Sequence, residues 1–271
     1  MDFTQVRPGV LTTVLDAEQA TATIIAGNSR CLLVDTGATP ATGAELRQAA
    51  ARTGVPLETV IVTHGHWDHA FGLAAFADLD TVGHENLVAD LRCTENLHWA
   101  AAHGIDLDDV PLPAHLLASI GVRNLGGLTV EIAHLGPAHT RSDLVVAVPE
   151  RQVILVGDLV ETGPPQFDET SDLDGWVRSL DALYNLVRDD AIVIPGHGDP
   201  IDRATVAHFR AGLAAIWDQA EWTFNQGVEQ SEAYDYDNLE WPWDRGTVEQ
   251  GIGLAYRELA ARGAQENHAV R

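Results

Sequence analysis

Four residues of the kinds that bind metal ions lie within one short segment of the chain, at His64, His66, Asp68 and His69. The apolar run 59–62 before them predicts a buried strand. Catalytic groups often occupy loops at the carboxyl ends of such strands. Imidazole and carboxylate are ligands that zinc takes in proteins. Three histidines and an aspartate held this close predict a metal site that follows the strand directly.

The apolar pattern of the whole chain alternates between short β-rich runs and amphipathic segments. It predicts strands at 10–15, 21–26, 31–35, 59–62, 81–84, 128–132, 144–148, 153–156 and 191–194. It predicts helices at 41–52, 70–77, 85–91 and 176–186. The turn at 149–151 joins two of the strands as a hairpin. Strands with interleaved helices indicate an α/β fold in which helices pack outside the sheets.

Two regions stand apart from this alternation. Residues 92–120 are irregular and are expected to form a helical insertion, whereas the chain from 205 onward is mainly helical in composition. The acidic run at 168–174 is interpreted as a cap for the helix that follows. A length of 271 residues fits one large domain or two modest ones.

The chain is strongly acidic, with a formal net charge of -24, no lysine and sixteen arginines. Such a surface repels phosphate backbones and anionic lipid heads, so binding of nucleic acid or of a membrane surface is not expected. Solubility is the favoured interpretation of this charge. Attraction of a cationic substrate is the alternative.

The sequence gives weaker signals of cellular compartment and of the redox state of its cysteines. The first residues lack the basic-then-apolar pattern of a secretory signal, and no run reaches the ~18 apolar residues of a membrane span. A cytoplasmic protein is therefore expected. The two cysteines, Cys31 and Cys93, do not form a disulfide framework, and Cys31 is expected to be buried.

The segment 64–69 resembles the H-x-H-x-D-H signature of the metallo-β-lactamase superfamily. Four further segments are similar to motifs of that family and occur in its order. They are the D-x-G turn at 35–37, the third-histidine segment at 136–140, the acidic segment at 156–158 and the G-H-G segment at 195–198. Any one of these is a weak signal, but five in order are specific.

This resemblance implies a four-layer αβ/βα sandwich with a helical C-terminal region. The metallo-β-lactamase-like catalytic domain would span 1–204, and 205–271 would be a helical extension packed on the same domain. The implied ligands are His64, His66 and His139 for one metal, Asp68, His69 and His197 for the other, and Asp158 as a bridge. Two zinc ions per chain are expected, with iron or manganese as alternatives. Relatives with two irons tend to carry a carboxylate at the position of His66.

A site of this kind implies a hydrolase, in which two metals share a hydroxide that attacks a carbonyl carbon. Asp68 would orient the hydroxide and take a proton. The expected reaction is cleavage of a carbonyl ester, lactone, thioester or amide ring in a small molecule. Trp67, Glu161 and Phe167 are the candidate pocket residues.

Several alternatives stay open. Asp158 stands where the commonest β-lactamases of this fold use cysteine, and Glu161 stands near their carboxylate-gripping lysine. A weak or promiscuous β-lactamase is therefore one alternative, and a small phosphodiesterase is another. An iron-dependent persulfide dioxygenase-like oxidoreductase is the redox alternative, and a non-catalytic protein with a structural metal is the last. A homodimer is a further hypothesis.

Overall fold

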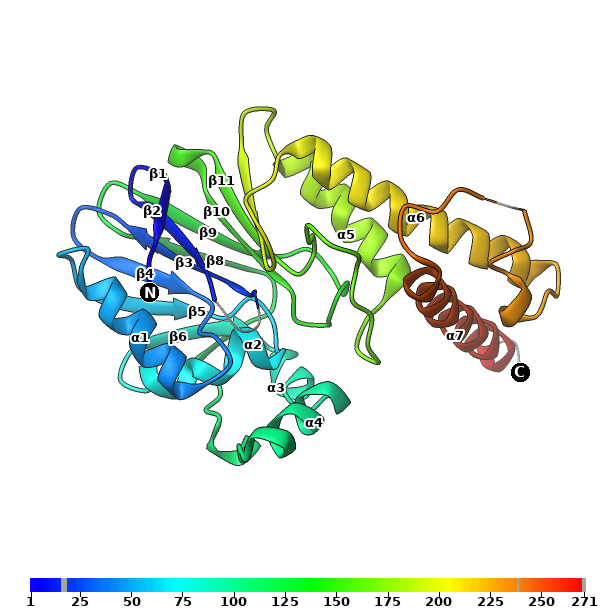
Figure 1. The fold of residues 1–271 in the computed structure, drawn as a ribbon, viewed down its shortest axis with the longest axis horizontal. Coiled ribbons are helices and arrows are strands. Elements are labelled where there is room, and N and C mark those ends of the chain that lie inside the picture. Colours follow the sequence, from blue (N-terminus) through cyan, green and yellow to red (C-terminus); the bar gives the residue numbers. More distant parts are fainter. Residues whose placement is uncertain (16–18, 238, 270–271) are drawn as a thin grey trace.

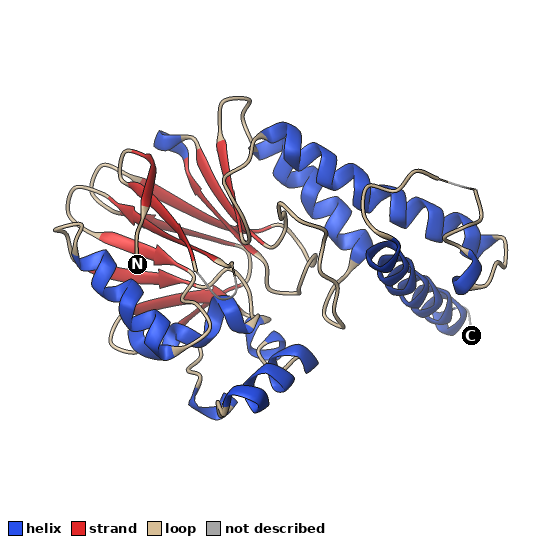
Figure 2. Ribbon diagram, viewed as in Figure 1, coloured by secondary structure: helices blue, strands red, loops and turns tan. Residues whose placement is uncertain are grey.

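Two β-sheets lie face to face in the computed structural model, which describes residues 1–15, 19–237 and 239–269 (Figures 1 and 2). The first sheet runs in chain order from β1 to β7. Its strands are β1 (Thr4–Arg7), β2 (Val10–Val14), β3 (Thr21–Ala26), β4 (Cys31–Val34), β5 (Leu57–Ile61), β6 (Asp80–His84) and β7 (His115–Leu117). The meander β1–β4 is antiparallel, and β4 to β7 are parallel to one another.

The second sheet has the order β12-β11-β10-β9-β8. Its strands are β8 (Ile120–Asn124), β9 (Thr129–His134), β10 (Leu144–Val148), β11 (Val153–Gly157) and β12 (Ile192–Pro195). The predicted hairpin is confirmed, because Val146 pairs with Leu155 in an antiparallel register. β12 then joins β11 in parallel, which brings the ends of these two strands to the same edge.

Helices lie outside the two sheets, with α1 packed on the first sheet and α5 on the second. They are α1 (Pro40–Ala51), α2 (Trp67–Ala70), α3 (Leu87–Asp90), α4 (Thr94–His103), α5 (Leu173–Leu186), α6 (Arg203–Asn225) and α7 (Arg245–Ala269). Short 3-10 helices occupy Phe71–Phe76, Leu107–Asp109, Pro149–Arg151 and Gln230–Glu232. Figure 1 shows α1 beside the first sheet, whereas α6 and α7 extend away from the sheets at the opposite end.

Three apolar clusters explain the layers. In β4, Cys31 and Leu33 face the cluster under α1, while Leu32 and Val34 face the second sheet. In β10, Val145 faces the cluster that contains α5, while its neighbours face the first sheet. Because successive side chains of a strand point to opposite faces, each sheet buries both of its surfaces. The expected four-layer α/β sandwich is confirmed.

The C-terminal helices share a cluster with α5. Trp176 of α5, Phe209 and Leu213 of α6 and Ile252 of α7 belong to the same buried set. Trp176 is fully buried, and its indole N–H donates to the carbonyl of Leu159 at 3.0 Å. The last two residues of the region expected over 205–271 lie outside the described residues.

The structure differs from the expected elements in three places. The strands β1, β7 and β8 were not predicted, because each is short and partly exposed and so lacks a clear apolar run. Residues 92–120 are helical at 94–103, but their last part forms β7 and the start of β8. The helix predicted over 70–77 is a 3-10 segment, Phe71–Phe76.

Cys31 and Cys93 are both buried free thiols. Across the described ranges, no helix combines the length and the apolar character needed to cross a bilayer.

Candidate metal centre

Four side chains of kinds that bind metals lie on the loop before α2 and on the first turn of that helix. His64 and His66 lie on the loop after β5, whereas Asp68 and His69 lie on the first turn of α2. All four are buried. The glycine between the two loop histidines is required, because a Cβ at Gly65 would lie 2.8 Å from the Cβ of Asp90.

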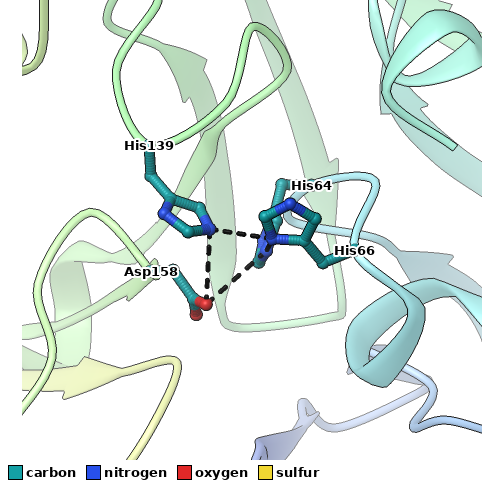
Figure 3. A group of neighbouring side chains, drawn as sticks. All are labelled: His64, His66, His139 and Asp158. Carbon is teal, nitrogen blue, oxygen red and sulfur yellow. Dashed lines mark hydrogen bonds and ion pairs between the residues drawn. The ribbon is translucent and has the colours of Figure 1, made fainter. Parts of the chain in front are cut away.

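One group of donors consists of His64, His66, His139 and Asp158 (Figure 3). The Nδ1 atom of His66 lies 3.2 Å from Nε2 of His64 and 2.9 Å from Nε2 of His139. The carboxylate Oδ2 of Asp158 lies 3.6 Å and 3.5 Å from the same two Nε2 atoms. Segments far apart in the sequence therefore direct four donor atoms at one point.

A second group of donors consists of Asp68, His69 and His197. Nε2 of His197 lies 3.2 Å from Oδ2 of Asp68 and 3.4 Å from Nε2 of His69. Asp158 lies between the two groups, since its carboxylate is also 3.3 Å from the Nε2 atoms of both His69 and His197. All seven predicted ligands thus meet in one cluster, in which six are buried and His197 is partly exposed.

The spacing of these donors fits metal binding. Ligand atoms about 2.0–2.1 Å from a tetrahedral zinc lie about 3.3 Å from one another. The donor separations in both groups, 2.9–3.6 Å, fall close to that value. The Oδ1 atom of Asp158 is buried without a hydrogen-bond partner among the described residues. A bound metal ion would supply the missing partner.

Three histidines of the cluster each have a polar partner outside the two donor groups. Asp35 accepts a hydrogen bond from Nδ1 of His69 at 2.9 Å, and Asp168 accepts one from Nε2 of His66 at 2.9 Å. Nδ1 of His64 lies 3.1 Å from the hydroxyl of Thr63. A partner on one ring nitrogen fixes the tautomer and leaves the other nitrogen available to a metal.

Asp35 belongs to the D-x-G turn and has an unusual backbone. Its φ of +64° is uncommon for a residue other than glycine. The carboxylate accepts from the backbone N–H of Thr63 at 2.7 Å and from the Thr63 hydroxyl at 2.9 Å. The turn therefore connects the end of β4 to the metal loop and to His69 at once.

Asp168 was not predicted as part of the site, because the acidic run around it was interpreted as a helix cap. Asp172 performs that capping role, since its carboxylate accepts from the N–H of Gly175 at 2.6 Å. One oxygen of Asp168 accepts bonds from Thr170 and Ser171, and the other faces His66. No local signal in the sequence connects Asp168 to a histidine 102 positions away.

Burial and close charges shift the pKa values of these groups in opposite directions. Burial lowers the pKa of His139 to about 4. Burial also disfavours a charged His197, yet the facing Asp158 raises the pKa of His197 to about 10. Burial acts against an ionised Asp158 as well, but the neighbouring imidazoles of His69 and His197 hold its pKa well below its usual range. The ionised carboxylate of Asp158 therefore stabilises positive charge on the histidines of the second donor group.

The three candidate pocket residues do not lie together. Trp67 and Phe167 both line an open cavity of about 600 Å³, together with Trp99, Asp168 and Glu169. Glu161 does not line this cavity; it is buried, and burial raises its pKa to about 8. Its nearest bonded partner in the described structure is the side-chain amide of Gln166, at 3.4 Å.

Comparisons with known proteins agree with the fold and the motifs. The model of the metallo-β-lactamase superfamily matches residues 15–197. The chain belongs to the metallo-β-lactamase superfamily. Metallo-β-lactamase type 2 of a Bacillus species is 25% identical over 55% of this chain and 54% of its own length. The 2,4-dinitroanisole O-demethylase subunit alpha of a Nocardioides species is 28% identical over 64% of this chain and 51% of its own length.

Two solved structures show the same fold. A metallo-β-lactamase from Pontibacter korlensis superposes with a TM-score of 0.65 at 20% identity, over 79% of this chain and 98% of that one. The metallo-β-lactamase TMB-1 gives a TM-score of 0.60 at 16% identity, over 78% and 95% of the two chains. This chain spans about half the length of the curated relatives it matches.

Proposed function

We propose that this protein is a binuclear metal-dependent hydrolase, loaded with two zinc ions, that cleaves a carbonyl ester, lactone, thioester or amide ring of a small molecule. The observation that carries the proposal is the pair of donor groups that share Asp158. His64, His66 and His139 would hold one metal, and Asp68, His69 and His197 would hold the other. A structural zinc site is usually closed by four protein ligands, whereas donors divided between two metals leave positions for water and substrate.

The residues of the chain have separable roles in this reaction. Bound metal ions supply Lewis acidity, which makes water more acidic and polarises a carbonyl group. We assign Asp68 the role of orienting the attacking water and accepting its proton, and its position beside His197 with 7% exposure supports this role. The outer partners Asp35 and Asp168 hold the imidazoles in position.

Zinc is favoured by the donor set, which contains five imidazoles and two carboxylates. Imidazole also suits iron and manganese, and these remain the alternatives. The relatives differ in what their names state: two are metallo-β-lactamases and one is an O-demethylase subunit. The family therefore supports metal-dependent hydrolysis more strongly than any one substrate.

Efficient hydrolysis of β-lactams is disfavoured by charge. A β-lactam antibiotic carries a carboxylate, and the chain has no lysine to bind it. The cavity beside the candidate metal centre is instead lined by the carboxylates of Glu95, Asp168 and Glu169. We therefore propose that β-lactams are poor substrates compared with uncharged or cationic carbonyl compounds.

A panel of lactone, thioester, ester, β-lactam and phosphodiester substrates tests the proposal, with zinc-loaded and chelator-treated protein in parallel. We expect turnover of at least one carbonyl class that chelation removes and zinc restores. His66→Ala should abolish that turnover with unchanged circular dichroism, while His208→Ala, on the exposed face of α6, serves as the matched control. Unchanged turnover in His66→Ala would reject the assignment.

Metal analysis of protein purified without added metal tests the redox alternative. We expect close to two zinc ions per chain. Roughly one iron per chain together with thiol-dependent oxygen uptake would overturn the hydrolase proposal.

A further inference from the structure

Trp67 and Trp99 form an aromatic wall of the open cavity beside the candidate metal centre. The rings of Trp67 and Trp99 stack with centroids 4.3 Å apart and an interplanar angle of 14°. His103 stacks against Trp99 at 4.0 Å, and the indole N–H of Trp67 donates to Glu95 at 3.1 Å. Trp67 stands between two candidate metal ligands in the chain, His66 and Asp68. A group bound against this wall would lie next to the metal centre.

The same cavity is lined by three carboxylates and no arginine. Glu95 accepts from the Trp67 indole, Glu169 accepts from the backbone N–H of Thr94, and Asp168 accepts from His66. Within the described ranges, none of the three forms an ion pair with an arginine. Each carboxylate accepts a hydrogen bond, and the three carboxylates outnumber the two imidazoles at the cavity, His98 in its lining and His66 bonded to Asp168.

Trp67 and His103 cover the two faces of Trp99, so the outer face of Trp67 is the aromatic surface that can meet an organic cation beside the carboxylates. A tryptophan face binds an ammonium ion through its quadrupole, and quaternary ammonium groups are recognised in this way. The wider field acts in the same direction, since the chain carries a net charge of -24. An anionic substrate group held against these carboxylates, and not at the metal ions, would meet repulsion from both sources.

We propose that the cavity lined by Trp67, Glu95, Trp99, Phe167, Asp168 and Glu169 receives an organic ammonium group of the substrate, so that the natural substrate is a cationic ester or amide. This inference rests on the proposed hydrolase function. In hydrolysis, water adds its oxygen to the acyl carbon, the bond from that carbon to the leaving group breaks, and a proton passes to the leaving group. No further reactant is needed.

Two esters with the same acyl group and nearly the same shape separate charge from size. One is the ester of choline, and the other is the ester of 3,3-dimethylbutanol, in which carbon replaces the ammonium nitrogen. With the zinc-loaded full-length protein, we expect a KM about tenfold lower for the choline ester, with similar kcat values. Equal KM values, or a lower KM for the neutral ester, would overturn the proposal.

Charge variants locate the effect in the cavity. The double variant Glu95→Gln/Glu169→Gln keeps an oxygen acceptor at each position and should bring the ratio of the two KM values close to one. The double variant Glu45→Gln/Glu221→Gln removes the same charge from exposed sites on α1 and α6 and should keep the ratio. An equal effect of both double variants would assign the preference to net charge and reject the cavity.

A binding measurement separates this inference from the hydrolase proposal. Tetramethylammonium should bind the zinc-loaded protein with saturation, followed by tryptophan fluorescence, and binding should weaken in Glu95→Gln/Glu169→Gln. Saturable binding without turnover of either ester would reject the ester hydrolase and support the cation site. Turnover of both esters with equal KM and no saturable binding would reject the cation site and leave the hydrolase standing.

Discussion

At the scale of single residues, Asp168 shows how the site depends on groups outside the ligand set. Its carboxylate is the partner of His66 Nε2, so the Nδ1 atom of His66 is left to face His64 and His139. Asp168→Asn leaves one acceptor oxygen, which cannot serve both His66 and the donors of Thr170 and Ser171. We expect zinc affinity, measured by competition with a chromophoric chelator, to fall by about 10- to 100-fold.

Thr170→Ala is the matched control for Asp168→Asn. It removes one bond to the other carboxylate oxygen of Asp168 and leaves the contact with His66 in place. An equal loss of affinity in both variants would mean that the loop conformation, and not the orientation of His66, determines zinc binding.

Gly196 is a second residue whose role is local and steric. A Cβ at this position would lie 1.8 Å from Oδ1 of Asp158 and 2.8 Å from the backbone of Gly157. We expect Gly196→Ala to displace Asp158, to lower the free energy of unfolding by about 1–3 kcal/mol in urea titration, and to weaken zinc binding. Gly163→Ala is the control, because an added Cβ there meets nothing within 4 Å. Normal zinc binding by Gly196→Ala would contradict this account.

At the scale of elements, the start of α5 depends on one capping side chain. Asp172 accepts from the N–H of Gly175, as expected for an N-cap aspartate. We expect Asp172→Ala to reduce the free energy of unfolding by about 1 kcal/mol, whereas Asp172→Asn should remain close to the parent protein. Chemical denaturation of both variants measures this difference. Equal stability of Asp172→Ala and Asp172→Asn would contradict the capping role.

The C-terminal helices raise a question about folding units. Because α5, α6 and α7 share one buried cluster with residues of β10 and β11, we propose that the extension over 205–271 folds together with the sandwich. A single unfolding transition, coincident by circular dichroism and by tryptophan fluorescence, is expected. Two separated transitions would show that the extension is an independent unit.

At the scale of the whole molecule, metal binding competes with protons on ligands that both sheets contribute. The pKa of His197 is raised to about 10, and those of His66 and His69 lie well above their usual range, so these groups hold protons at neutral pH in the metal-free protein. Zinc must displace these protons. Affinity is therefore expected to rise with pH, by about tenfold per pH unit for each proton released.

Chelator competition between about pH 6 and about pH 8, with proton release measured by calorimetry in buffers of different ionisation enthalpy, checks this coupling. Affinity should be lost progressively toward acid pH, where the histidines retain their protons. An affinity that does not change over this interval would contradict the assignment of these histidines as ligands.

The sequence by itself predicted an α/β fold from its apolar runs and a metal-binding segment from the spacing of His64 to His69, because both are local signals. The four-layer sandwich and the further ligands proposed, His139, Asp158 and His197, could be predicted only through resemblance to a family. Short, half-exposed strands such as β7 escaped prediction, since their pattern is set by neighbouring strands and not by their own residues.

Only the tertiary structure decided what surrounds those ligands. The contacts of Asp168 with His66 and of Asp35 with His69 join segments that no local pattern relates. The same is true of the cavity, where Trp67, Glu95 and Glu169 meet from three segments and Glu161 is left out. Sequence motifs can predict which residues are candidate ligands. The orientation of those side chains, the charges around them and the shape of the pocket depend on packing between residues distant in the chain.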